Sequence, residues 1–234
     1  MIADAREIQT KRLRLRPFRE EDYDDLYEFL AQLRDDEFEG YPGITYENCR
    51  KHLLNRLRSE DFYAVELRAS GKVIGNVYCG DREYDAKEVG YIIHRLYRRK
   101  GYGAEALSAV IRRAFHEGAH RVYAMCDPRN VPSWKLLERV GMRREAHFRQ
   151  NVFFHRDETG APIWKDTFVY ALLNGDQIQK KWLSESAESH FLLVSSYSTN
   201  RSTNWNVRQS TNPRLVSRSS GRHRQNEVCL SKDL

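Results

Sequence analysis

Hydrophobic residues follow two different spacings along the chain. Leu13 and Leu15 alternate with arginines and Pro17 closes the run, which predicts a short strand at the edge of a sheet. Two stretches with helical spacing come next. The first follows the acidic residues 20–22, and the second follows Thr45, whose hydroxyl can cap a helix. The apolar stripes are Leu26, Phe29, Leu30 and Leu33 in the first stretch, and Tyr46, Cys49, Leu53, Leu54 and Leu57 in the second.

From residue 62 onward the apolar positions alternate with polar ones, which is the spacing of strands. The predicted elements are a hairpin over 62–79, a strand over 89–93, a helix from Ala104 to Gly118, a strand over 121–126, a short helix that carries Leu137 and stops at Gly141, and two strands over 147–154 and 164–173. This order contains a strand–helix–strand unit around residue 103. It predicts an α/β (α+β) fold in which helices cover a mixed sheet.

The composition divides the chain into two parts. Its 234 residues exceed what one core needs, since a single domain holds about 100–200 residues. Residues 181–234 hold eight Lys or Arg against four Asp or Glu, and twelve of the sixteen serines. We therefore expect a folded domain over 10–176 and a Ser-rich basic tail over 180–234 that is largely disordered.

Charge and hydropathy narrow the classes of partner. Of the formal charge of +6, the tail contributes +4, so the rest of the chain is nearly balanced and nucleic acid is not expected as a partner. No stretch approaches the roughly 18 apolar residues of a membrane helix, so we expect no membrane contact and a cytoplasmic location. The four cysteines are widely spaced, and no metal site is expected.

One short stretch combines glycine with positive charge between a predicted strand and a predicted helix. Two glycines let the backbone turn tightly, and the start of a helix offers unpaired N–H groups and a partial positive charge. Three basic side chains add full charges at the same place, which suits a pyrophosphate. The stretch is Arg98, Arg99, Lys100, Gly101, Tyr102, Gly103 and Ala104. We expect it to bind an anionic ligand.

This stretch resembles the Gln/Arg-x-x-Gly-x-Gly/Ala signature of the GNAT N-acetyltransferases, in which backbone amides bind the pyrophosphate of acetyl-coenzyme A. A second similarity follows the next predicted strand, where Asn130 and Ser133 precede a short helix that ends in Gly141-Met142. Both motifs lie in the order and on the elements that the family has. The resemblance implies the GNAT fold over about residues 10–175, with a central, mostly antiparallel twisted sheet flanked by helices and a splayed parallel strand pair at the coenzyme site.

The details resemble the ribosomal-protein N-terminal acetyltransferase branch of this family, namely Thr10 to Arg16, Asn130 to Trp134, and Trp164 to Leu172. The resemblance implies an acyltransferase that moves acetyl from acetyl-CoA to a primary amine by direct attack in a ternary complex, without a metal. A protein N-terminus is the expected acceptor. The alternatives are a small amine, such as a polyamine, amino acid or aminoglycoside, and a coenzyme-binding sensor or scaffold without catalysis. For the oligomeric state, a homodimer is an alternative to a monomer.

The resemblance also implies roles for residues around the loop. Ile92, Ile93 and His94, at the end of the preceding strand, would bind the acetyl carbonyl and the pantetheine arm. Asn130 would bind the same arm, or else cap its helix. The loops over 39–43 and 156–163 would shape the acceptor pocket.

The catalytic acid and base are less defined. Many family members carry a tyrosine seven residues after the motif asparagine, and this chain has Leu137 there. Ser133 is the alternative proton donor, although its place next to Pro132 is also that of a residue that only satisfies a helix N-terminus. Glu88 is the expected general base and Glu66 a second candidate, and either carboxylate could instead be only solvated.

Overall fold

The computed structural model describes residues 6–34, 36–38, 41 and 43–176, and the predicted tail over 180–234 lies outside them. Within the described part, eight strands form one sheet in the order β1-β2-β3-β4-β5-β6-β8-β7. The strands are β1 Ile8–Gln9, β2 Leu13–Arg16, β3 Phe62–Leu67, β4 Val73–Arg82, β5 Ala86–Ile93, β6 Arg121–Cys126, β7 Arg143–Arg156 and β8 Pro162–Leu173. The helices are α1 Tyr23–Ala31, α2 Arg50–Arg58, α3 Tyr102–His116 and α4 Val131–Arg139, with short 3₁₀ turns η1 Glu20–Asp22 and η2 Arg95–Tyr97. This arrangement confirms the predicted α/β fold.

The sheet is antiparallel except where β5 meets β6. These two strands run parallel and pair over only three residues each, Ala86–Glu88 with Arg121–Tyr123. Beyond that point β5 continues to Ile93 and β6 continues to Cys126 without pairing to one another. The parallel pair is therefore splayed toward its carboxyl end, as the resemblance implies.

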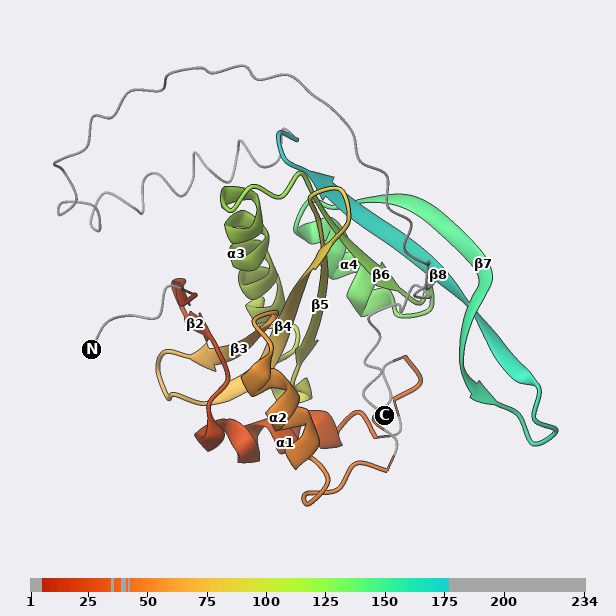
Figure 1. Cartoon of the computed structure of the whole chain (residues 1–234), viewed down its shortest axis with the longest axis horizontal. Coiled ribbons are helices and arrows are strands. Elements are labelled where there is room, and N and C mark those ends of the chain that lie inside the picture. The colour runs from red at the N-terminus through yellow and green to blue at the C-terminus, as the bar shows by residue number, and fades with distance from the viewer. Residues whose placement is uncertain (1–5, 35, 39–40, 42, 177–234) are drawn as a thin grey trace, which may run out of the picture.

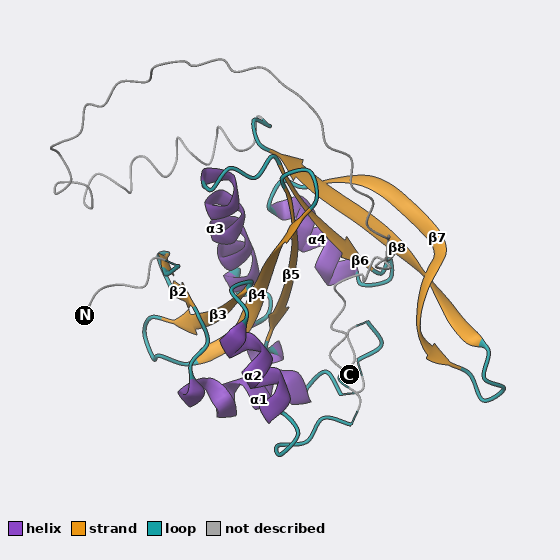
Figure 2. Cartoon of the chain, in the orientation of Figure 1, coloured by secondary structure: helices purple, strands orange, loops and turns teal. Residues whose placement is uncertain are grey.

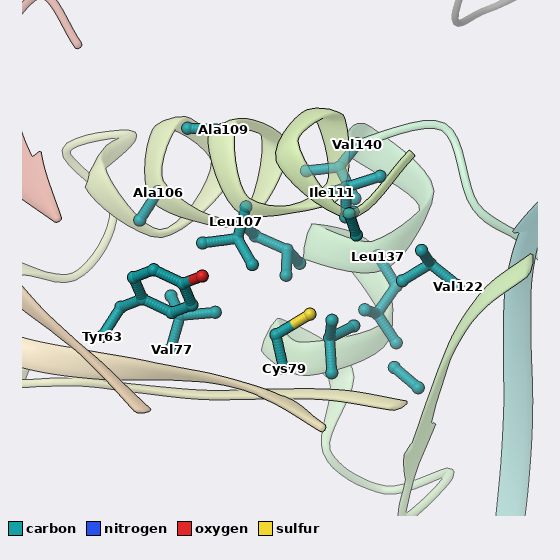
Figure 3. Close-up of a cluster of buried hydrophobic side chains, with 14 of the residues drawn as sticks. Tyr63, Val77, Cys79, Ala106, Leu107, Ala109, Ile111, Val122, Leu137 and Val140 are labelled. Atoms are coloured by element: carbon teal, nitrogen blue, oxygen red, sulfur yellow. The ribbon is translucent and has the colours of Figure 1, made fainter. Parts of the chain in front are cut away.

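Helices cover both faces of the sheet (Figure 1). On one face α3 and α4 pack on the inward side chains of β2 to β6. Figure 3 labels those of β3, β4 and β6 beneath the two helices. The stripe of α3 that makes this contact is fully buried and includes Leu107 and Ile111. On the other face α1 and α2 bury Phe29 and Leu53 against the sheet, together with Ile92. Each face thus has its own apolar core.

The helix that Thr45 was expected to start begins later, at Arg50. Thr45 does cap a turn: it and Asn48 exchange side-chain bonds with one another's backbone N–H groups, at 3.2 and 2.9 Å, and residues 46–49 form a turn that precedes the helix. The apolar stripe expected after Thr45 still contributes to the core, because Cys49 and Leu53 are fully buried.

Strands β7 and β8 form a long hairpin that extends away from the helices (Figure 2). Most of β7 is exposed, while β8 pairs with β6 over Phe168–Leu173 and is buried at Tyr170, Ala171 and Leu172. Among the described residues, none of the helices combines the length and the apolar character needed to cross a bilayer.

Candidate functional site

The loop that leads into α3 has a conformation that aims backbone N–H groups outward. Arg99 and Gly101 adopt positive φ values of 62° and 83°, and Gly101 is the N-cap of α3. The first hydrogen bond of the helix runs from the N–H of Glu105 to the carbonyl oxygen of Gly101, at 3.0 Å. Helix geometry therefore leaves the N–H groups of residues 102–104 without an acceptor inside the helix. These groups, with the helix dipole, can bind an anion.

Three cations stand beside these amides. Arg98, Arg99 and Lys100 are all exposed. Arg98 donates from Nε to the carbonyl oxygen of Ile93 at 2.8 Å, which ties the loop to the end of β5. The loop and the open end of the splayed strand pair are thus one continuous site.

A second clamp on the loop comes from β2 and the residues before it. Arg12 donates from Nη1 to the carbonyl oxygen of Lys100 at 2.9 Å, and its guanidinium lies 4.3 Å from the centre of the Tyr102 ring. Glu105, on the first turn of α3, accepts from Thr10 Oγ1 at 2.7 Å and from Arg12 Nε at 2.7 Å. Burial alone would raise the pKa of Glu105, but these hydrogen bonds and the charge of Arg12 lower it below its ordinary value. Glu105 therefore holds the start of α3 as a carboxylate.

Gly103 allows α3 and α4 to approach one another. A Cβ at this position would lie 2.7 Å from Leu136 Cδ1 and 3.5 Å from Ile93 Cγ1. A side chain at position 103 would therefore point between β5 and α4, and not toward the outer surface of the loop.

Successive residues at the end of β5 direct their backbone groups to opposite edges of the strand, toward β4 or toward β6. The N–H of His94 donates to the carbonyl oxygen of Ile74 on β4, at 2.8 Å. Because alternate residues of a strand direct their backbone groups to opposite edges, those of Ile93 and Tyr91 face the gap beside β6. Ile92, like His94, directs its backbone toward β4, so Ile93 is the member of the expected trio whose amide faces the gap.

The His94 side chain turns away from this gap. Its Nδ1 accepts from the N–H of Leu96 at 3.3 Å and caps η2, while Nε2 lies 3.5 Å from Glu28 on α1. Burial lowers the pKa of His94, although the nearby Glu28 opposes that shift. The structure thus gives this ring a local capping role and does not bring it to the expected coenzyme site.

Asn130 and Ser133 lie together at the start of α4. Asn130 is the N-cap, and its Oδ1 accepts from the N–H of Ser133 at 3.2 Å. Its side-chain oxygen therefore has the capping role that was the alternative to coenzyme binding. The hydroxyl of Ser133 lies 2.9 Å from the phenol oxygen of Tyr91 on β5, and that phenol also donates to the Ser133 carbonyl oxygen at 2.9 Å. The sequence reasoning missed Tyr91, whose only signal was its place two residues before Ile93.

Leu137 is packed in the core and is only 1% exposed (Figure 3). The position at which many family members carry a phenol is therefore filled here by an apolar side chain beneath α3. The phenol nearest to Ser133 instead comes from the sheet.

The two carboxylates considered as bases are both buried and paired. Glu88 is 4% exposed, bonds Arg82 Nε and Nη2 at 2.9 and 2.7 Å, and lies three residues before Tyr91, so it projects from the opposite face of β5. Glu66 on β3 is held by Arg16 Nε at 2.5 Å and by Arg14 Nη1 at 3.1 Å. The structure does not bring Glu66 to the gap. Glu88 stays on the strand that borders it.

A hollow lies beside the end of β6 and next to Asn130. Its lining comes from residues 125–127, Asn130, Phe38 and the middle of the β7–β8 hairpin, namely Val152, Phe154 and 165–167. The segment that follows α1 docks there, because Glu37 forms an ion pair with Arg129 at 3.3 Å and its carbonyl oxygen accepts from Lys165.

The residues that line the hollow are not those of the two loops that were expected to shape the acceptor pocket. Residues 156–163 form the tip of the hairpin, away from α3 and α4 (Figure 1), and the lining uses the middle of the hairpin instead. Glu39, Gly40 and Pro42 of the other expected loop lie outside the described residues.

The described residues contain no group of three or more His, Cys, Asp or Glu side chains that could hold a metal ion. Cys126, at the end of β6, is buried and lines the hollow.

Comparisons with known proteins agree with this geometry. A family model described as an acetyltransferase (GNAT) domain matches residues 12–143. The chain is similar to the uncharacterized N-acetyltransferase YnaD of Bacillus subtilis, at 31% identity over 71% of this chain and 96% of YnaD. It is also similar to the structure of a GNAT-family acetyltransferase from Bacillus anthracis, at 27% identity and a TM-score of 0.64, over 72% of this chain and 98% of that one. The structure of RimL, a ribosomal L7/L12 alpha-N-protein acetyltransferase in complex with coenzyme A, shares the fold at 18% identity and a TM-score of 0.63, over 73% and 99% of the two chains.

Proposed function

The chain belongs to the GNAT acetyltransferase family and is an N-acetyltransferase, and we propose that it moves acetyl from acetyl-CoA to a protein N-terminal amine by direct attack in a ternary complex. The observation that carries the proposal is the loop over Arg98–Ala104. In it the free amides of a helix start and three exposed cations stand at the open end of β5.

The coenzyme site fits the shape and charge of a pyrophosphate. The amides of residues 102–104 bind its oxygens, and Arg98, Arg99 and Lys100 neutralise its charge. When bound, acetyl-CoA supplies an acetyl thioester whose pantetheine arm enters the gap between β5 and β6. There the N–H of Ile93 is the hydrogen-bonding partner, because it faces the gap while the carbonyl oxygen of Ile93 accepts from Arg98.

The chain's own residues then account for the proton transfers. An amine must lose a proton to attack a thioester, and the leaving thiolate is stabilised when it gains one. Ser133 stands at the start of α4 beside the gap and donates to the leaving sulfur. Glu88 is the carboxylate on β5 that accepts the amine proton through water. Its ion pair with Arg82 at 2.7 Å fixes the position of the carboxylate.

The choice of a protein N-terminus as acceptor has two supports. The sequence patterns at Thr10–Arg16, Asn130–Trp134 and Trp164–Leu172 resemble those of ribosomal-protein acetyltransferases. RimL, which shares the fold, acts on the α-amine of a ribosomal protein. The hollow beside Asn130 is the proposed entry for that amine, since it lies next to the start of α4.

The proposal is tested by supplying acetyl-CoA with three sets of acceptors and measuring thiol release. The sets are peptides with a free N-terminus, the same peptides with a blocked N-terminus and an internal lysine, and small amines such as polyamines and aminoglycosides. We expect turnover with the first set and acetylation at the α-amine by mass spectrometry. Turnover confined to small amines would overturn the assignment of a protein N-terminus as the acceptor. Coenzyme binding without turnover in any set would favour a sensor.

A further inference from the structure

A phenol from β5 and a serine hydroxyl from α4 meet at the start of α4. Tyr91 reaches from β5, and its oxygen lies 2.9 Å from both Oγ and the carbonyl oxygen of Ser133. Both side chains are half-buried. Because 42 residues separate them, the contact depends on how α4 is placed on the sheet.

The pairing constrains where the two protons lie. A phenol has one proton to donate and can also accept. When Tyr91 donates to the Ser133 carbonyl oxygen, the phenol oxygen can still accept from the Ser133 hydroxyl, which can also turn its proton toward a ligand. When Ser133 donates to a ligand, the phenol can turn its proton to Ser133 Oγ. The geometry therefore allows a chain of two hydrogen bonds that ends at the gap.

Serine alone is a poor acid for this reaction. Thiols and phenols ordinarily titrate near 8.5 and 10, whereas serine is not among the side chains that usually transfer protons in catalysis. A serine that gives up its proton without replacing it becomes an alkoxide, which is far more basic than the thiolate it protonates. A phenol behind the serine removes this difficulty.

We propose that Tyr91 is a positioning residue for the leaving-group step, which orients the Ser133 hydroxyl and restores its proton. The inference rests on the proposed function. As the bond between the acetyl carbon and sulfur breaks, its electron pair goes to sulfur, and sulfur takes the proton of Ser133 Oγ. Ser133 Oγ takes the proton of Tyr91 in the same step. The resulting phenolate recovers a proton from water, and the proton lost by the amine leaves through its base.

The phenol is not needed to hold the start of α4. Asn130 already caps the N–H of Ser133, and Trp134 Nε1 donates to the carbonyl oxygen of Pro128 at 3.2 Å. Pro132 in the first turn favours the helix start as well. These contacts hold the start of α4 independently of the bond between Tyr91 and the Ser133 hydroxyl, so removing the phenol tests that bond without removing the helix cap.

The test compares Tyr91→Phe, Ser133→Ala and the double variant, with Tyr63→Phe as the matched control because it removes a phenol from the same core, on β3. For each variant kcat, the KM of the acceptor, and the calorimetric Kd of acetyl-CoA are measured. We expect Tyr91→Phe to lower kcat about 10- to 100-fold with an unchanged Kd. The double variant should lose no more than Ser133→Ala alone, because the two groups act as one unit. Tyr63→Phe should keep full kcat.

An unchanged kcat in Tyr91→Phe, or additive losses in the double variant, would overturn the inference. Absence of turnover in the wild type with every acceptor would instead overturn the proposed function. Should Tyr91→Phe fail to fold, difluorotyrosine at position 91 keeps the ring and lowers the pKa of the phenol. Since the phenol must be protonated to donate, we expect kcat to fall at alkaline pH and this fall to move to lower pH in the difluorotyrosine variant. An unmoved profile would overturn the inference.

Discussion

Arg12 donates a hydrogen bond to the carbonyl oxygen of Lys100 across 88 positions of sequence, at 2.9 Å. The same guanidinium holds Glu105 and covers the Tyr102 ring, so one side chain next to β2 contacts the anion-binding loop and the first turn of α3. The loop is therefore held in place before any ligand arrives. Such preorganisation lowers the free-energy cost of binding.

Replacing Arg12 should weaken coenzyme binding more than chemistry. Arg12→Ala removes the bonds to Lys100 and Glu105, so we expect the Kd of acetyl-CoA to rise about tenfold, which corresponds to about 1.4 kcal/mol, while kcat changes little. Arg14→Ala is the matched control, because Arg14 lies on β2 and pairs with Glu7 and Glu66 instead. Calorimetric titration measures the Kd of acetyl-CoA for the two variants. An equal loss of affinity in both would contradict the role given to Arg12.

Gly101 should tolerate a side chain poorly because of its backbone. Its φ of 83° costs an alanine about 1–2 kcal/mol, and relief of that strain would turn the amides of α3 away from the ligand. Gly118, just after the other end of α3, has a φ of 100° and open space around it. We expect Gly101→Ala and Gly118→Ala to lower the free energy of unfolding similarly, while only Gly101→Ala weakens acetyl-CoA binding. Equal binding by both would show that the loop does not hold the coenzyme.

The carboxylate of Glu105 should make stability depend on pH in the acidic range. Its pKa is lower in the folded chain than in the unfolded chain, since hydrogen bonds from Thr10 and Arg12 outweigh its burial. A depressed pKa stabilises the fold above the unfolded value of about 4.3, and that stability is lost as the pH falls through the folded value. The difference in unfolding free energy between wild type and Glu105→Gln should be constant above about pH 5 and shrink below pH 4. Urea titrations at several pH values measure this difference, with Glu158→Gln, at an exposed position, as the control. A difference between wild type and Glu105→Gln that does not change with pH would contradict the prediction.

Removing one charge from the buried network near α1 should lower the free energy of unfolding more than removing an exposed charge. Arg16 binds Asp22 through two bonds of 2.8 Å and Glu66 through one of 2.5 Å, and all three side chains are almost completely buried. Removing one partner from such a group costs about 3–5 kcal/mol, because the remaining charge is left uncompensated. Asp22→Ala should lose that much unfolding free energy. Glu20→Ala, which breaks an exposed pair with Arg50, should lose less than about 1 kcal/mol. Equal losses would contradict the account.

The elements with strong periodicity could be predicted from the sequence. The alternation over 121–126 gives β6 at its observed bounds, and the stripe that begins at Ala104 gives α3 to within two residues at each end. The predicted start of α2 was too early, because residues 46–49 form a separate turn, capped by Thr45 and Asn48, before the helix begins at Arg50. The length of β7 was underestimated because most of its residues are exposed, so hydrophobic alternation marks only its middle.

The site was predictable only where its signal is local. The loop over Arg98–Ala104 is contiguous, so its glycines and charges can be read directly. Contacts between distant elements have no such signal, and both Arg12 and Tyr91 act through them. The sequence likewise shows that His94 follows a strand, but not that its ring turns toward Glu28.

The claim that the loop over Arg98–Ala104 holds the pyrophosphate is tested most directly by comparing two ligands on two proteins. Acetyl-CoA carries the pyrophosphate and acetyl-pantetheine lacks it, and both are titrated into the wild type and Gly101→Ala. We expect the wild type to bind acetyl-CoA much more tightly than acetyl-pantetheine, and Gly101→Ala to lose most of that preference while its affinity for acetyl-pantetheine is unchanged. Equal affinity of the wild type for the two ligands, or a preference that survives in Gly101→Ala, would contradict the account.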